Sequence, residues 1–143
     1  MRQQEEGIVK KEAIIYVDDR GWKYRVMPGL GDNTYKARYQ KPDSQRWTCC
    51  PRLPWRGTPE EAQADLELMV KKKKKKWVRC CQVSRKALEH IIEEREPEGM
   101  YFTLEGSVWV AVDNSTGDAL TEDFLDLESA LQWLAEPCKE GYL

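Results

Sequence analysis

Short segments in which apolar and polar residues alternate constrain the fold of this chain most. Residues 22–26 and 35–39 alternate aromatic or aliphatic side chains with lysine and arginine, which is the two-residue period of a half-buried strand. A β-branched run at residues 13–17 precedes them, residues 46–50 follow, and turn residues separate all four segments. The pattern predicts an antiparallel meander of three or four strands.

The start of a helix after this meander is the clearest local signal in the sequence. Thr58 can serve as N-cap, Pro59 suits the first helical position, and Glu61 completes a capping box. Apolar residues then recur at helical spacing until the lysine run at residues 71–76, which predicts the end of the helix.

The second half of the chain has a similar order of elements. Residues 77–83 look extended, Ser84 can cap a second helix, and Asp126 can open a third, amphipathic one. Three further strands are expected at residues 100–104, 108–112 and 119–124. This order resembles a degenerate internal duplication.

We therefore expect an α+β fold in which an amphipathic helix packs on each antiparallel meander. Two βββα-like units would be joined by a central helix. Residues 1–77 would form a basic unit, residues 78–98 a connecting strand and helix, and residues 99–143 an acidic unit.

Charge is divided unevenly along the chain although the net charge is only −2. Through Lys86 there are 21 basic and 11 acidic residues, a balance of +10, and from Ala87 onward 2 basic and 14 acidic residues give −12. Such a division indicates contact with nucleic acid or an acidic interaction surface. The alternative interpretation is that the two halves attract each other within one molecule.

Several classes of protein are disfavoured by the sequence. No apolar run approaches the roughly 20 residues of a membrane helix, and the charged N-terminus has no apolar stretch behind it. We expect a cytoplasmic protein with no membrane partner. No Walker, G-x-G-x-x-G or G-x-S-x-G motif occurs, and the single histidine, His90, has no nucleophile motif. We therefore expect neither an enzyme nor a cofactor; an enzyme without a recognisable motif remains a third alternative.

The five cysteines are Cys49, Cys50, Cys80, Cys81 and Cys138. Their odd number, the two adjacent pairs and the missing export signal favour free thiols over a disulfide framework. The two pairs could instead bind structural zinc as a tetrathiolate through Cys49, Cys50, Cys80 and Cys81. Adjacent cysteines rarely direct both sulfurs at one ion, so buried free thiols are the preferred interpretation.

Basic residues of the first half are the candidate binding residues. Because residues two apart on a strand point the same way, the lysines and arginines should share one sheet face and the rings the opposite, helix-covered face. Trp55, in a proline-rich loop, should be the most exposed ring. The lysine run could neutralise phosphates or complement the negative end of the helix. The candidates are Lys23, Arg25, Lys36, Arg38, Arg46, Arg52, Arg56, Lys71, Lys72, Lys73, Lys74, Lys75 and Lys76.

A motif in residues 22–77 resembles the arm-type, AP2-like DNA-binding module of mobile-element tyrosine integrases. The matching residues are Tyr24 and Val26, then Tyr35, Ala37 and Tyr39, then Trp47, and finally Thr58-Pro59-Glu60-Glu61-Ala62. In that family three strands lie on one helix and the outer sheet face enters the major groove. The resemblance implies that Lys23, Arg25, Lys36, Arg38 and Arg46 contact bases and phosphates. No recombinase catalytic domain follows the motif, so we expect no recombination activity.

Two functions of different classes follow from these observations. The first is a non-enzymatic accessory protein of a mobile element or phage that binds nucleic acid, DNA rather than RNA. The alternative is a protein-binding inhibitor or adaptor. An anti-CRISPR protein, which blocks a nucleic-acid-processing enzyme such as a CRISPR nuclease, is one example, because an acidic half can imitate a phosphate backbone.

Overall fold

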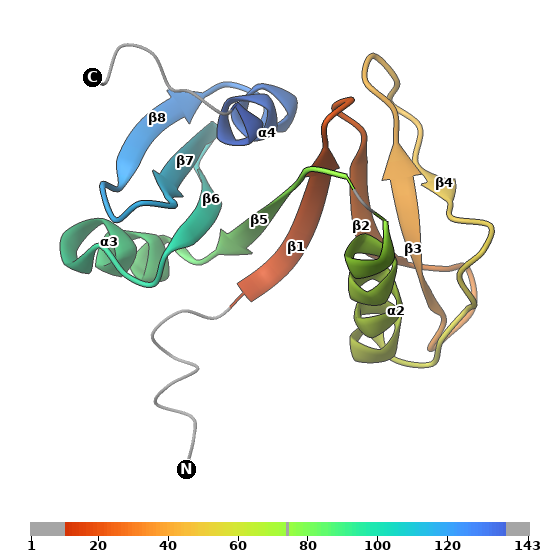
Figure 1. The fold of residues 1–143 in the computed structure, drawn as a ribbon. Coiled ribbons are helices and arrows are strands. Elements are labelled where there is room, and N and C mark those ends of the chain that lie inside the picture. The colour runs from red at the N-terminus through yellow and green to blue at the C-terminus, as the bar shows by residue number, and fades with distance from the viewer. Residues whose placement is uncertain (1–10, 74, 137–143) are drawn as a thin grey trace. The chain divides into compact units, whose positions relative to one another are not determined.

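The computed structural model describes residues 11–73 and 75–136, which form strands and helices of an α+β fold, as expected (Figure 1). In chain order the elements are β1 (Lys11–Asp18), β2 (Lys23–Pro28), β3 (Tyr35–Gln40), β4 (Thr48–Cys49), α2 (Pro59–Lys72), β5 (Trp77–Val83), α3 (Arg85–Glu94), β6 (Gly99–Glu105), β7 (Val108–Asn114), β8 (Leu120–Phe124) and α4 (Leu127–Ala135). No helix within the described ranges is long and apolar enough to cross a membrane.

The chain divides into two compact units, each of which is described separately. We call Ile15–Trp77 the basic unit, and Met1–Ile14 together with Val78–Leu143 the acidic unit. The basic unit was expected to span residues 1–77; its end after Trp77 coincides with that expectation, but it begins at Ile15 and not at the N-terminus. The segment 78–98, expected as a separate connector, is instead part of the acidic unit, because β5 pairs with β6 and α3 packs on β6 and β7.

The strands of the basic unit form an antiparallel meander in the order β4-β3-β2-β1. The turn between β1 and β2 closes with a hydrogen bond from the Gly21 amide to the Asp18 carbonyl, and Gly21 adopts the positive φ of 86° that favours glycine. Strand β4 has only two residues, fewer than the five expected. Before the strand, the Arg46 amide donates its hydrogen bond to the Ser44 hydroxyl. After the strand, Pro51 has no amide hydrogen to donate.

Helix α2 begins where the sequence predicts. The Thr58 hydroxyl accepts a hydrogen bond from the Glu61 amide at 3.2 Å and donates one to the Glu61 carboxylate at 3.3 Å. The side chains of Ala62 and Leu66 are buried against the sheet, since α2 contacts β2 and β3. This end of α2 is therefore fixed both by its cap and by its apolar face.

The helix covers the ring-bearing face of the meander. Ala37 is the only buried residue of β3, and Tyr24, across from Tyr39 in the register, is buried on the same face. The rings of Trp77, which follows the helix, and Tyr24 form an edge-to-face pair with 5.1 Å between their centroids. The rings lie on the helix-covered face, as alternation predicts.

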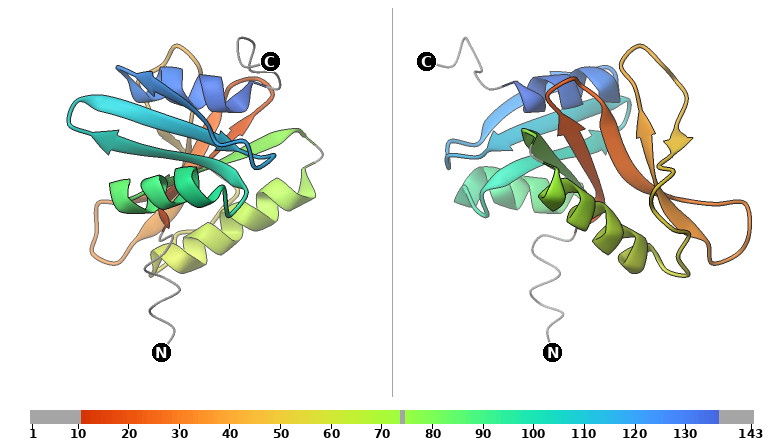
Figure 2. Two further views of the ribbon diagram at one scale, coloured as in Figure 1. Left: turned by 90° about the vertical axis from the view of Figure 1, so that its left-hand side faces the viewer. Right: turned by 45° about the vertical axis from the view of Figure 1, so that its right-hand side comes forward.

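The acidic unit has strand order β5-β6-β7-β8, in which β5 and β6 are parallel and the other pairs antiparallel. A parallel pair needs a crossover connection, which α3 supplies. Helices α3 and α4 lie on opposite sides of the three antiparallel strands (Figure 2). Tyr101 and Val112 face the α3 core, whereas Phe102 and Ala111, one residue along, are buried on the other face.

Candidate nucleic-acid interface

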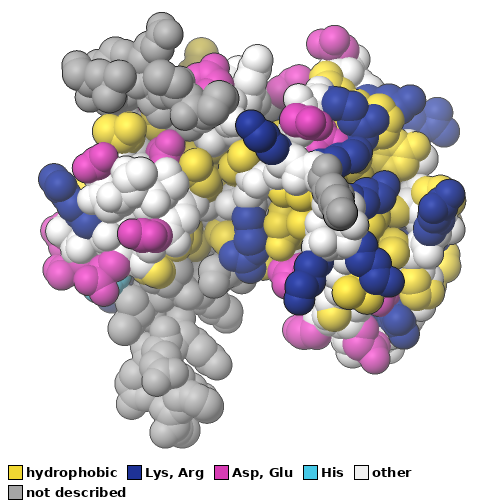
Figure 3. Space-filling model, in the orientation of Figure 1, with side chains coloured by type: hydrophobic (Ala, Val, Ile, Leu, Met, Phe, Trp, Pro, Cys, Tyr) yellow, Lys and Arg dark blue, Asp and Glu magenta, His cyan; other side chains and the backbone are white. Residues whose placement is uncertain are grey.

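One of the two units has a net positive charge and the other a net negative charge. The basic unit contains 15 basic and 8 acidic residues, a balance of +7, whereas the acidic unit contains 8 basic and 17 acidic residues, a balance of −9. In the basic unit, lysine and arginine side chains lie among hydrophobic ones at the surface (Figure 3). The charge division seen along the sequence is thus also a division between folded units.

Seven cations of the basic unit are exposed and make no ion pair with a carboxylate within the described residues. They are Lys41, Arg46, Arg52, Lys71, Lys72, Lys73 and Lys76. Six of the seven are candidates from the sequence. Lys41, at the turn after β3, was not expected, although its position in a turn beside Pro42 signals exposure. Lys74, another candidate, lies outside the described residues.

Two further candidates are engaged with carboxylates. Arg56 donates to both carboxylate oxygens of Asp65 on α2, at 2.7 and 3.0 Å, and this hydrogen bonding raises the pKa of Arg56. The ammonium group of Lys75 lies 3.5 Å from the carboxylate of Asp18. These two cations are therefore partly neutralised and less available to an external anion.

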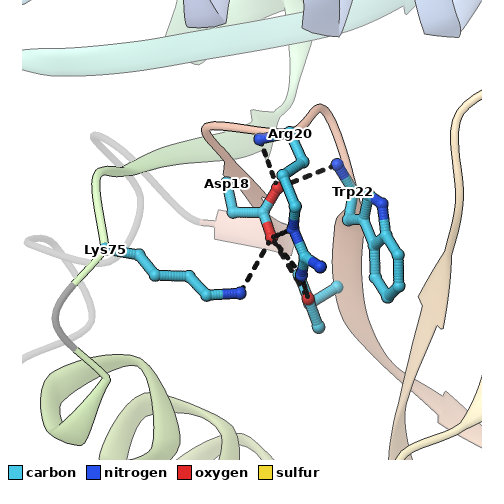
Figure 4. A network of polar contacts seen from close by, with 5 residues as sticks. Asp18, Arg20, Trp22 and Lys75 are labelled. Carbon is cyan, nitrogen blue, oxygen red and sulfur yellow. Dashed lines mark hydrogen bonds and ion pairs between the residues drawn. The ribbon is translucent and has the colours of Figure 1, made fainter.

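Asp18 is the centre of the polar network in Figure 4. Its side chain is 0% exposed and accepts hydrogen bonds from the Arg20 guanidinium, the backbone amides of Arg20 and Trp22, and the Tyr24 hydroxyl. Burial alone would raise the pKa of Asp18, but these hydrogen bonds outweigh it and the pKa lies below its ordinary value. Burial, together with the negative charge of Asp18, raises the pKa of Tyr24 to about 12.

The four strand cations share one sheet face, as alternation predicts. Arg25 lies directly across from Arg38, and Lys23 and Lys36 are each two residues away on the same strands. We call Lys23, Arg25, Lys36 and Arg38 the strand array. It lies on the face opposite α2.

The strand array is less exposed than we expected. Lys23 is only 6% exposed, and Arg25, Lys36 and Arg38 are half-buried. Burial lowers the pKa of Arg25. The Nε atoms of Arg25 and Arg38 are buried and have no hydrogen-bond partner among the described residues. The expectation that these cations are exposed is therefore wrong for Lys23. Alternation predicts on which sheet face a side chain lies, but not whether other residues bury that face.

Two partly exposed indole rings lie beside cations. Trp55 is 48% exposed, in accord with the prediction for the proline-rich loop, and the Lys36 ammonium is 5.3 Å from its ring centroid. Trp22 is stacked on Tyr39 at 5.5 Å between centroids, and the Arg20 guanidinium lies 3.8 Å from the Trp22 centroid. Trp22 therefore has neighbours on its ring already, whereas Trp55 is the more open surface for stacking.

The cysteines do not converge in either unit. Cys49 and Cys50 belong to the basic unit and Cys80 and Cys81 to the acidic unit, and none of the four forms a disulfide bond. Burial raises the pKa of Cys50 to about 11. No group of three or more His, Cys, Asp or Glu side chains that could hold a metal ion occurs within residues 11–73 and 75–136. Cys138 lies outside the described residues.

No protein-family model, no curated protein and no solved structure matches the chain. The resemblance to the integrase arm module therefore stays a prediction that rests on the motif residues alone.

Proposed function

We propose that this protein is a non-enzymatic nucleic-acid-binding protein and that its basic unit binds DNA through the phosphate backbone. The observation that carries the proposal is the set of seven exposed cations that have no carboxylate partner among the residues the structure describes, in a chain that has more acidic than basic residues. Such cations release the counterions condensed on DNA when they contact phosphates, which supplies affinity without regard to base sequence.

The alternative explanation for the lysines is complementation of the helix dipole. Lys71 and Lys72 lie in the last turn of α2, where positive charge is favourable without any ligand. This explanation does not extend to Arg46 and Arg52, which lie in loops and are exposed. DNA is proposed rather than RNA, and a mobile element or phage as the source, because the motif in residues 22–77 resembles integrase arm modules.

A direct test compares two double variants at low salt. Replacing Arg46 and Arg52 with glutamine should weaken binding to a duplex of about 20 base pairs several-fold, because each lost phosphate contact removes about one unit of salt dependence. The matched control removes two exposed charges from the acidic unit, with Lys86→Gln and Arg95→Asn; asparagine tolerates the left-handed conformation at position 95. Fluorescence anisotropy measures both. Equal losses in the two variants would contradict the proposal.

A second candidate function, a protein-binding adaptor or inhibitor, is favoured by a surface on the acidic unit. Leu104, Trp109 and Phe124 are direct neighbours across β6, β7 and β8 on one sheet face. Leu104 is 46% exposed, and Leu125, next in the chain after Phe124, is 85% exposed. Trp109 and Phe124 are only partly exposed, because their rings pack on Phe102 and on Trp133 of α4. Leu104 and Leu125 are therefore the exposed apolar side chains here, and such side chains on a strongly acidic unit are typical of sites for protein partners. Capture of a nuclease by the wild-type protein, with no DNA binding at low salt, would favour this candidate.

A further inference from the structure

Strands β2 and β3 hold two arginines directly across from each other. The register pairs Arg25 with Arg38, and places Lys23 beside Gln40 and Met27 beside Lys36. Like charges that face each other across an antiparallel pair are destabilising. The basic unit thus bears an electrostatic cost at this position.

No side chain in the described part of the chain offsets that cost. The Arg25 side chain makes no hydrogen bond and no ion pair there, and the Arg38 side chain donates only one long bond, from Nη2 to the Pro28 carbonyl at 3.4 Å. The Nε atoms of both arginines are buried without an acceptor. The sequence contains 25 acidic residues, but no carboxylate in the described part of the chain pairs with these two arginines.

Two half-buried arginines whose Nε donors lack acceptors, and which have no carboxylate partner among the described residues, have the chemistry of an oxyanion site. Each guanidinium presents several N–H donors in a rigid fork that matches the oxygens of a phosphate group. A tetrahedral phosphate held by the Nη donors of the two forks would neutralise the opposed charges. Charge-assisted hydrogen bonds of this kind are stronger than neutral ones.

We propose that Arg25 and Arg38 form a clamp for one phosphodiester group, with Lys36 beside it. This inference deepens the proposed function and rests on it: it assigns the tightest backbone contact to two half-buried arginines and not to the exposed lysines. Phosphate contacts carry no base sequence directly, so the clamp holds duplexes of different sequence alike. Because its arginines are half-buried, the contact is screened less by salt than contacts made by the exposed cations.

The test uses lysine substitutions, which preserve charge and remove only the forked donors. In the clamp variant, Arg25→Lys with Arg38→Lys, affinity for a duplex of about 20 base pairs should fall about 10-fold or more, since the forked, bidentate geometry of both contacts is lost while the charge stays. In the control variant, Arg46→Lys with Arg52→Lys, two exposed arginines change in the same way and affinity should stay within about twofold. Anisotropy with two duplexes of unrelated sequence gives the affinities, and circular dichroism verifies the fold.

A direct readout comes from the wild-type protein. The Nε–Hε resonances of Arg25 and Arg38 should shift when the duplex is added, in ¹⁵N spectra assigned by single arginine-to-lysine variants. This readout decides the question even if the double variant does not fold.

The outcomes separate the clamp from the proposed function. Wild-type binding with equal affinities for the clamp and control variants, and unmoved Nε resonances, would overturn the clamp and leave nucleic-acid binding intact. A loss confined to one of the two duplex sequences would overturn the phosphate assignment in favour of a base contact. No binding by the wild-type protein at low salt would overturn both proposals.

Discussion

The carboxylate of Asp18 lies buried at the turn between β1 and β2, surrounded by donors from four residues. Arg20, Trp22 and Tyr24 are near it in sequence, whereas Lys75 comes from the segment that follows α2. The turn itself follows from local sequence, because Asp18 to Gly21 has hairpin-turn composition. The burial of Asp18 and its pairing with Lys75 depend on residues far apart in the chain, so sequence patterns do not reveal them.

Replacement of Asp18 by asparagine should lower the free energy of unfolding by about 2–3 kcal/mol, because the cations and the buried hydrogen-bond network lose their anionic acceptor. Urea unfolding near neutral pH measures the difference. The exposed neighbour provides the control: Asp19→Asn should change stability by less than about 0.5 kcal/mol. Equal effects of the two substitutions would show that the Asp18 network does not stabilise the fold.

The same network predicts a dependence on pH. Because the folded pKa of Asp18 lies below its ordinary value, ionised Asp18 stabilises the fold at pH values above about 4, and this contribution is lost as the pH falls through the lowered pKa. Urea unfolding of the wild-type protein should therefore show a loss of stability in acid that the Asp18→Asn variant lacks. Parallel pH profiles for the two proteins would contradict this assignment.

Helix starts are the elements that local sequence predicts best in this chain. Thr58, Ser84 and Asp126 were each expected as N-caps, and each accepts a hydrogen bond from the amide three residues further on. A cap depends on a side chain and an amide within one turn, so the local sequence contains the whole interaction.

Loss of the Thr58 cap should destabilise the protein by about 1 kcal/mol, because the Glu61 amide at the start of α2 would lose its acceptor. Thr58→Ala tests this by urea unfolding. Thr58→Ser preserves the acceptor, and its free energy of unfolding should stay within about 0.3 kcal/mol of the wild-type value. The cap makes no net contribution if alanine and serine are equally stable at this position.

Strand pairing was predicted less fully than helix starts. The antiparallel hairpins of both units follow from alternation and turn residues, but the parallel pair of β5 and β6 does not. The two strands are connected through α3, and the alternation of apolar and polar residues does not predict which strands pair in parallel. For the same reason, residues 78–98 resemble a connector in the sequence although they belong to the acidic unit.

For the molecule as a whole, the sequence predicts which segment is rich in lysine and arginine, but not which of these cations pair with carboxylates. The basic unit was expected and carries a balance of +7. Arg56 and Lys75 were expected to be free cations, but Asp65 and Asp18 partly neutralise them. Which cations remain available depends on side chains that only the folded structure brings near. Among the described candidates outside the helices and strands, Arg46, Arg52, Lys73 and Lys76 remain exposed and without a carboxylate partner in the described ranges.

The salt dependence of DNA binding tests the central claim most directly. The association constant of the wild-type protein for a duplex of about 20 base pairs is measured by anisotropy between about 50 and about 200 mM salt. If the exposed cations of the basic unit contact phosphates, log K should fall linearly with log salt, with a slope between about −3 and −6. A slope near zero, or no binding at the lowest salt, would contradict the account.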